Sequence, residues 1–77
     1  MKLFSEWLKE ERVKAGLTQG ELAGKLQISR QWLNTVENES FGVLPMKHWE
    51  KLADALGVHR ETIAHVALQT WLIKGNM

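Results

Sequence analysis

The sequence contains no cysteine and only one proline among its 77 residues. Without cysteine, the chain cannot form a disulfide, a thiol nucleophile or a cysteine-ligated metal site. No stretch approaches the roughly 18 consecutive apolar residues that a membrane helix needs, and Glu6 interrupts the N-terminal segment early. These absences predict a soluble, uncleaved protein without membrane contact, and they fit a reducing cytoplasm.

The net charge is also small, because ten Lys and Arg residues against nine Asp and Glu leave a formal charge of +1. Such a charge does not by itself indicate a nucleic-acid partner, since the placement of charges decides electrostatic binding. The 44% of hydrophobic residues indicates an ordered globular chain. Its length predicts one domain over residues 1–77, near the lower limit for a self-sufficient core.

Catalytic and metal-binding signals are weak. The three histidines, His48, His59 and His65, do not share a helical face, and Asp54 is the only aspartate. No spacing typical of a zinc-binding helix occurs. The sequence therefore predicts no enzyme activity, no metal site and no cofactor.

The first segment with helical periodicity runs from about Lys2 to Ala15. Gly16 follows it and can adopt the left-handed conformation that ends a helix. The apolar residues recur at spacings near three and four, and they are Leu3, Phe4, Trp7, Leu8 and Val13.

Two short helices should follow. Thr18 and Glu21 have the spacing of a capping box, which predicts a second helix beginning at Gln19. Ser29 is the next good N-cap, so a third helix is expected from Arg30 to about Glu37.

The remaining chain predicts a loop and two further helices. Residues 40–44 show no helical period, Pro45 suits the first turn of a fourth helix, and Gly57 ends that helix. A fifth helix is expected from about Arg60 to Ile73. No segment shows a strand pattern, so the chain should be a compact all-α domain of five helices. The fourth helix has a buried stripe of Trp49, Leu52, Ala53 and Leu56.

The fifth helix is apolar over more of its circumference than one buried stripe requires. A domain this small can hardly bury both of its apolar rows. One explanation is a homodimer interface on residues 60–73; the alternative is that the helix lies flat on the core. The expected interface residues are Ile63, Ala67, Leu68, Trp71 and Leu72.

Two helices joined by a short turn have the geometry of a helix-turn-helix. From about Leu8 to Val58 the sequence also resembles the lambda-repressor-like or Cro-like helix-turn-helix proteins, in which the second and third helices form the motif. The matching residues are Leu8, Arg12, Gly16-Leu17-Thr18-Gln19, Leu22-Ala23, Ile28-Ser29, Leu33, Val36-Glu37-Asn38, Leu52-Ala53 and Leu56-Gly57.

The resemblance implies a largely buried ion pair between Arg12 and Glu37. At several positions the sequence departs from the family pattern. Gln27 stands where glycine is usual, so it should adopt the left-handed conformation at a free-energy cost of roughly 1 kcal/mol. Glu39 replaces the glycine that commonly ends the third helix, which suggests that Asn38 provides a left-handed residue instead. Gly24 should weaken the second helix.

The third helix should present a base-reading face to DNA. Leu33, Val36 and Glu37 point to the core on a helical wheel, which leaves a polar face on the opposite side. Arg, Asn and Gln can bond to base edges in the major groove, and the Thr methyl can contact thymine. The alternative is a merely solvated face. The expected base-reading residues are Arg30, Gln31, Asn34, Thr35 and Asn38.

Contacts to DNA phosphates are expected from fewer residues than is common, because residues 40–44 carry no positive charge. The resemblance implies that Gln19 contacts the backbone, where the N-terminus of a helix favours an anion. Trp32 is ambiguous: it either packs against the Phe41 loop or contacts sugar, phosphate or a thymine methyl. The candidate phosphate-binding residues are Gln19, Lys25, Ser29, Trp32, Lys47 and His48.

These features predict a cytoplasmic transcriptional regulator that binds double-stranded DNA. The main hypothesis is a homodimeric repressor of a palindromic operator. The alternative is an antitoxin-like protein-interaction module, which would hold a partner protein through the 41–44 loop or the fifth helix. The weak positive charge favours the alternative, whereas the polar face of the third helix favours DNA.

Overall fold

The computed structural model describes residues 2–76, and all of its regular structure within that range is helical. The expected all-α fold of five helices is confirmed. One 3-10 turn, η1, precedes the fourth helix. The elements are α1 (Phe4–Lys14), α2 (Gln19–Leu26), α3 (Arg30–Asn38), η1 (Met46–His48), α4 (Trp49–Leu56) and α5 (Arg60–Gly75).

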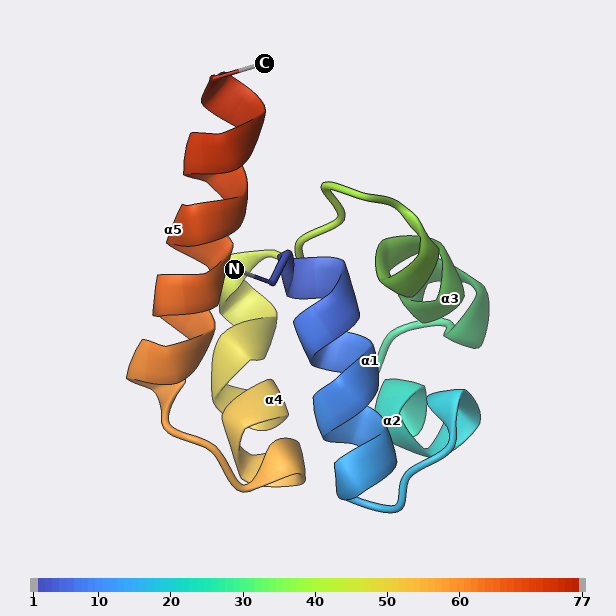
Figure 1. Ribbon diagram of the computed structural model, residues 1–77. Coiled ribbons are helices and arrows are strands. Elements are labelled where there is room, and N and C mark those ends of the chain that lie inside the picture. Colours follow the sequence, from blue (N-terminus) through green and yellow to red (C-terminus); the bar gives the residue numbers. More distant parts are fainter. Residues whose placement is uncertain (1, 77) are drawn as a thin grey trace.

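Helix α1 lies at the centre of the fold, with α2 and α3 on one side and α4 and α5 on the other (Figure 1). It packs against α3 and α5, while α2 contacts both α3 and α4. The C-terminal half of α5 extends beyond the other helices (Figure 1). The helix-turn-helix pair α2 and α3 therefore rests on a support made by α1 and α4.

One hydrophobic core joins all five α-helices. Burying apolar side chains is the main favourable contribution to folding, at roughly 25 cal/mol per Å² removed from water. The core includes the positions expected between and below α2 and α3. Its largest fully buried apolar side chains are Phe4, Leu8, Leu22, Leu26, Leu33, Leu44, Leu52 and Ile63.

A buried threonine connects the two ends of the chain. Oγ1 of Thr70 accepts a hydrogen bond from the backbone N–H of Phe4 at 2.8 Å and donates one to the carbonyl of Val66 at 2.9 Å. Leu3, the N-cap of α1, provides no side-chain cap. Helix α5 thus satisfies a backbone N–H that the start of α1 would otherwise leave without a partner.

The start of each motif helix is capped as predicted. In the box at α2, the N–H of Glu21 donates to Oγ1 of Thr18 at 3.0 Å, and the N–H of Thr18 donates to Oε1 of Glu21 at 2.9 Å. The bond from the Thr18 N–H holds the pKa of the Glu21 carboxyl below its usual value. At α3, Oγ of Ser29 accepts from the N–H of Trp32 at 3.0 Å. These bonds fix where both helices begin.

The turn between α2 and α3 depends on a left-handed residue. Gln27 has φ 58° and ψ 43°, as predicted, and its N–H bonds to the carbonyls of Ala23 and Gly24. The expectation for the end of α3 was wrong. Asn38 stays helical and Glu39 is extended at φ −93°, and Gln27 is the only non-glycine residue with positive φ in residues 2–76. An extended residue can leave α3 directly, so no left-handed residue is needed there.

Three other local expectations need correction. Val13 does not belong to the buried face of α1, because 61% of its surface is exposed at the far end of the helix. Pro45 does not lie in the first turn of α4 but before η1, where its carbonyl accepts from the N–H of His48 at 3.0 Å. The 41–44 loop exposes less apolar surface than expected: Leu44 is fully buried, and Phe41 and Val43 are partly buried.

The apolar rows of α5 divide between core and surface. Ile63 and Ala67 are fully buried inside the monomer, so they cannot contact a second chain and the expectation that they form a dimer interface was wrong. Packing against α1 and α4 covers this row. The remaining three residues of the expected interface stay exposed, at 52% for Leu68, 48% for Trp71 and 58% for Leu72.

Candidate nucleic-acid interface

Helix α3 buries one side and exposes the other. Leu33, Val36 and Glu37 are buried, so these three residues anchor α3 to the interior of the protein. We call the exposed opposite side the recognition face. All of the side chains expected on this face are exposed, and they are Arg30, Gln31, Asn34, Thr35 and Asn38.

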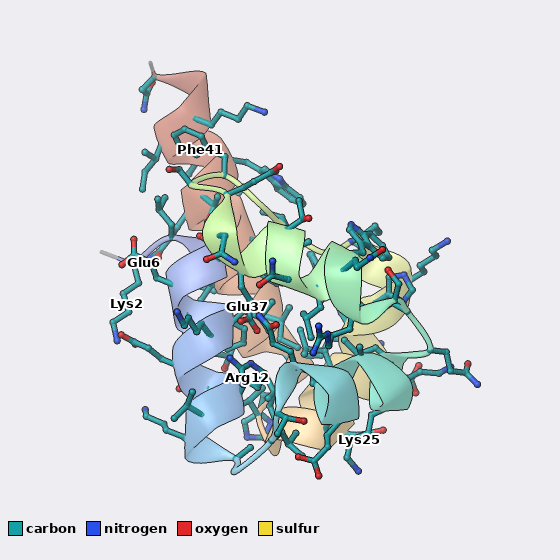
Figure 2. All side chains as sticks on the ribbon, turned by 90° about the vertical axis from the view of Figure 1, so that its right-hand side faces the viewer. Lys2, Glu6, Arg12, Lys25, Glu37 and Phe41 are labelled. Carbon is teal, nitrogen blue, oxygen red and sulfur yellow. The ribbon has the colours of Figure 1, made fainter. Side chains whose placement is uncertain are left out.

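A buried ion pair fixes α3 to α1. Nε of Arg12 lies 2.8 Å from Oε2 of Glu37, and Nη2 of Arg12 lies 3.2 Å from Oε1. Nη1 of Arg12 also donates to the carbonyl of Leu17 at 2.8 Å. Figure 2 shows the two labelled side chains facing each other beneath α3. This is the pair that the family resemblance implies, and its parallel hydrogen bonds determine the orientation of both groups.

Gln19 connects this ion pair to the recognition face. Its Nε2 donates to Oε1 of Glu37 at 3.1 Å and to Oδ1 of Asn34 at 3.1 Å. Both hydrogens of the amide are therefore engaged inside the protein. The family resemblance implies that Gln19 contacts phosphate, but in this arrangement its side chain presents only an oxygen, which phosphate repels. The backbone N–H at the start of α2 remains the better phosphate donor.

Two residues of the recognition face bond along their own helix. Nδ2 of Asn38 donates to the backbone carbonyl of Asn34 at 2.8 Å and to Oδ1 of Asn34 at 2.9 Å. Oγ1 of Thr35 donates to the carbonyl of Gln31 at 3.0 Å. With its hydroxyl proton directed into the helix, Thr35 presents its methyl group and oxygen lone pairs outward.

Trp32 packs against η1, a contact that neither sequence expectation named. Its ring lies edge-on to the ring of His48, with 5.4 Å between the centroids and an interplanar angle of 74°. The contact ties α3 to η1. It leaves 37% of Trp32 exposed, so the indole borders the recognition face.

His48 is poorly suited to the expected contact with a phosphate. Its Nε2 atom is buried and makes no hydrogen bond with any described residue. Burial lowers the pKa of His48 below its ordinary value, and the nearby charges of Lys47 and Lys51 act in the same direction. A neutral ring with a buried nitrogen is a weak ligand for an anion, so the expectation for His48 is corrected.

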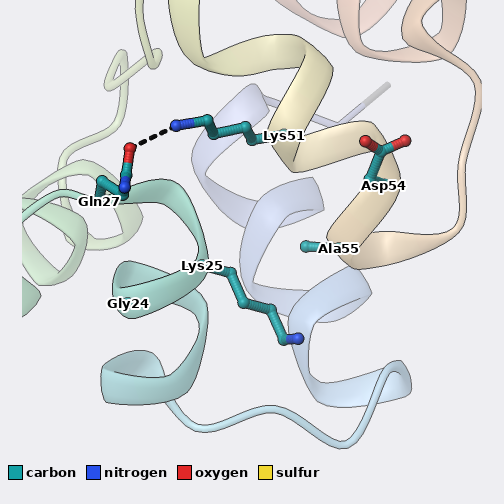
Figure 3. A pocket seen from close by; sticks show the side chains of 6 residues that line it. All are labelled: Gly24, Lys25, Gln27, Lys51, Asp54 and Ala55. Atoms are coloured by element: carbon teal, nitrogen blue, oxygen red, sulfur yellow. Dashed lines mark hydrogen bonds between the residues drawn. The ribbon is translucent and has the colours of Figure 1, made fainter.

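The other candidate phosphate contacts have separate surroundings. Oγ of Ser29 is occupied as the N-cap of α3, whereas Lys25 and Lys47 are exposed. Figure 3 shows Lys25 beside an open hollow between α2 and α4. Across that hollow, Lys51 of α4 bonds through Nζ to Oε1 of Gln27, the left-handed residue of the turn.

The roles of Gln19 and Lys51 inside the protein were not predicted from the sequence. Gln19 is 18 positions from Glu37 and Lys51 is 24 positions from Gln27. No local pattern indicates either bond. The family pattern gave the only available signal, because it places Gln19 and Glu37 in the same motif.

Within residues 2–76, no cluster of three or more His, Asp or Glu side chains is arranged to hold a metal ion. In the same part of the chain, every helix is too short or too polar to cross a membrane.

A family model described as a helix-turn-helix domain matches residues 3–66, which covers all of α1 to α4 and the first half of α5. No curated protein and no solved structure gave a match. Domains of this kind are typical of DNA-binding regulators that are not enzymes. This match agrees with the capped helices α2 and α3 and the tight turn between them. The chain belongs to the helix-turn-helix domain family.

Proposed function

We propose that the protein is a homodimeric transcriptional repressor that binds an inverted-repeat operator with α3 in the major groove. The observation that carries the proposal is the recognition face, which is exposed and polar on a helix with a capped N-terminus. Arg, Gln, Asn and Thr are the side chains that bond to base edges there. A solvated helix face would more commonly carry lysine and glutamate.

Backbone contacts should come from a small set of groups. We assign them to the N-terminus of α2 at Gln19, to Lys25 and Lys47, and to Trp32 at the border of the recognition face. Each phosphate neutralised contributes a slope of about −0.9 to the dependence of log affinity on log salt. With few such contacts in one protomer, useful affinity at physiological salt requires two protomers on one DNA site.

The exposed part of α5 supports the dimer. Leu68, Trp71 and Leu72 together expose large apolar surfaces on the half of α5 that extends beyond the other helices (Figure 1). Trp71 also stacks on the buried Trp49, with 6.3 Å between centroids, so the patch has a rigid base. Half-sites read by such dimers lie about 34–36 Å apart, so a symmetric contact through this patch has to hold the two α3 helices at that separation.

Selection of binding sites from random duplex DNA tests the function directly. We expect a palindromic motif from the purified protein at low salt. Recovery of no motif would end the DNA-binding proposal, and recovery of a single non-repeated half-site would end the inverted-repeat proposal.

Sedimentation tests the dimer separately. The variant Leu68→Glu with Leu72→Glu should be monomeric at micromolar concentration and should lose affinity for the palindrome. Val13→Glu is the matched control, because Val13 is equally exposed but lies on α1; it should remain dimeric. A wild-type protein that sediments as a monomer with and without DNA would contradict the dimer.

A further inference from the structure

The orientations of two side-chain amides at the recognition face follow from one buried carboxylate, and a third amide adds a second bond to the same site. We propose that Glu37, acting through Gln19, holds the Asn34 amide with its nitrogen outward, so that Asn34 favours guanine over adenine. This inference rests on the proposed function, because it concerns the bases that α3 would contact.

The first amide is set by charge. The side chain of Glu37 has no exposed surface and is paired with Arg12 at 2.8 Å, so it is an ionised group that only accepts hydrogen bonds. Gln19 approaches Oε1 of Glu37 to 3.1 Å. A Gln19 oxygen at this position would face a carboxylate oxygen with no proton between them. Gln19 must therefore turn its nitrogen toward Glu37.

The orientation of the second amide follows from the first, and a backbone carbonyl sets the third. The same Gln19 nitrogen lies 3.1 Å from the Asn34 side chain, which must present Oδ1 to receive its hydrogen. Asn38 lies 2.8 Å from the backbone carbonyl of Asn34, an acceptor, and so must present Nδ2. That nitrogen also reaches Oδ1 of Asn34 at 2.9 Å. Two donors thus converge on one Asn34 oxygen, and a flipped Asn34 would lose both bonds.

This arrangement changes what Asn34 can recognise. Asparagine commonly reads adenine by accepting from N6 and donating to N7 at the same time. Oδ1 of Asn34 already accepts two hydrogen bonds and faces Gln19, whereas Nδ2 makes no hydrogen bond with any described residue. The outward amide is a donor. Guanine offers two acceptors, O6 and N7, to the two hydrogens of Nδ2. Adenine offers N7 alone and places its N6 donor beside the Asn34 donor.

Base preference at one position tests the assignment. Asn34→Ala identifies the base pair that Asn34 contacts, because discrimination there is lost. At that position the wild-type protein should prefer guanine over adenine by about tenfold or more. Gln19→Ala removes one of the two hydrogen bonds that hold the Asn34 oxygen inward, so the guanine-to-adenine ratio should fall. The ratio is informative even if this variant binds all sequences more weakly.

Gln31→Ala is the matched control. Gln31 lies on the same face but makes no side-chain bond in the Glu37 network, so the variant should alter a different base position and keep the guanine-to-adenine ratio at the Asn34 position. A wild-type preference for adenine at that position would overturn the inference, as would a ratio that Gln19→Ala leaves unchanged.

A measurement without DNA separates this inference from the proposed function. In the free protein, NMR should show the side-chain N–H protons of Gln19 and Asn38 exchanging with water roughly fivefold more slowly than those of Asn34. Equal or reversed rates would refute the amide orientation. If no DNA motif is selected but the rates are as expected, the orientation stands, while the DNA-binding function and the guanine preference both fail.

Discussion

Gly42 lies directly against the backbone of Val36 in the last turn of α3. A Cβ atom placed on Gly42 would be 2.4 Å from the Val36 carbonyl oxygen and 3.0 Å from its Cα. Atoms this close must move apart, and the obstacle is helix backbone with no flexible side chain that could yield. The absence of a side chain at Gly42 therefore lets the 41–44 loop close over the core beneath α3.

Replacing this glycine should destabilise the protein. Gly42→Ala should lower the free energy of unfolding by about 1–3 kcal/mol, because either the loop or α3 must shift. Gly24→Ala is the matched control: Gly24 lies inside α2 with nothing within 4 Å of an added Cβ, so the same substitution should stabilise by roughly 0.5–1 kcal/mol. Urea unfolding measures both. Equal effects of the two variants would contradict the close contact with Val36.

The left-handed turn of the motif offers a stabilising substitution. Gln27→Gly should raise the free energy of unfolding by up to about 1 kcal/mol, because glycine adopts positive φ without strain. The variant also loses the exposed bond to Lys51, and Lys51→Ala measures that loss separately. Thermal unfolding of both variants gives the comparison. A destabilised Gln27→Gly beside a neutral Lys51→Ala would show that Gln27 is not strained.

The ion pair beneath α3 should be costly to break and less costly to replace. Arg12→Ala leaves the Glu37 carboxylate buried without its partner, which should lower the free energy of unfolding by roughly 3–5 kcal/mol. The double variant Arg12→Met with Glu37→Leu removes both charges and should recover much of that loss. Denaturant unfolding compares the two. A double variant no more stable than Arg12→Ala would show that the pair itself stabilises the fold.

Mild acid should destabilise the protein through His48. Because burial keeps the pKa of His48 below its ordinary value of 6.5, the unfolded chain takes up a proton more readily than the folded one. The free energy of unfolding should therefore fall as the pH drops through about 6.5 and continue to fall until the folded ring is protonated.

The variant His48→Gln isolates this contribution. Its unfolding free energy should vary less than that of the wild type between about pH 7.5 and 5.5. The same pH dependence in both proteins would assign the effect to other groups. An NMR titration of the wild type provides the second measurement, and the His48 ring should titrate below the ordinary histidine value.

Local signals in the sequence determine the helices and the turn of this protein without reference to tertiary contacts. The Thr18 and Glu21 box and the Ser29 cap act within four residues, so they can be read directly from the sequence. The left-handed Gln27 was likewise predictable, because the family pattern requires a residue with positive φ between the two helices. The family model matches residues 3–66, a range that contains these short-range features.

Only the tertiary structure decided which surfaces face each other. Periodicity showed two apolar rows on α5, but packing against α1 and α4 buries Ile63 and Ala67 and leaves Leu72 exposed. The amide bonds from Gln19 and the contact of Gly42 with Val36 likewise join residues on different elements. Such contacts depend on how rigid helices are placed in space, and helical periodicity fixes the faces of a helix without specifying what covers them.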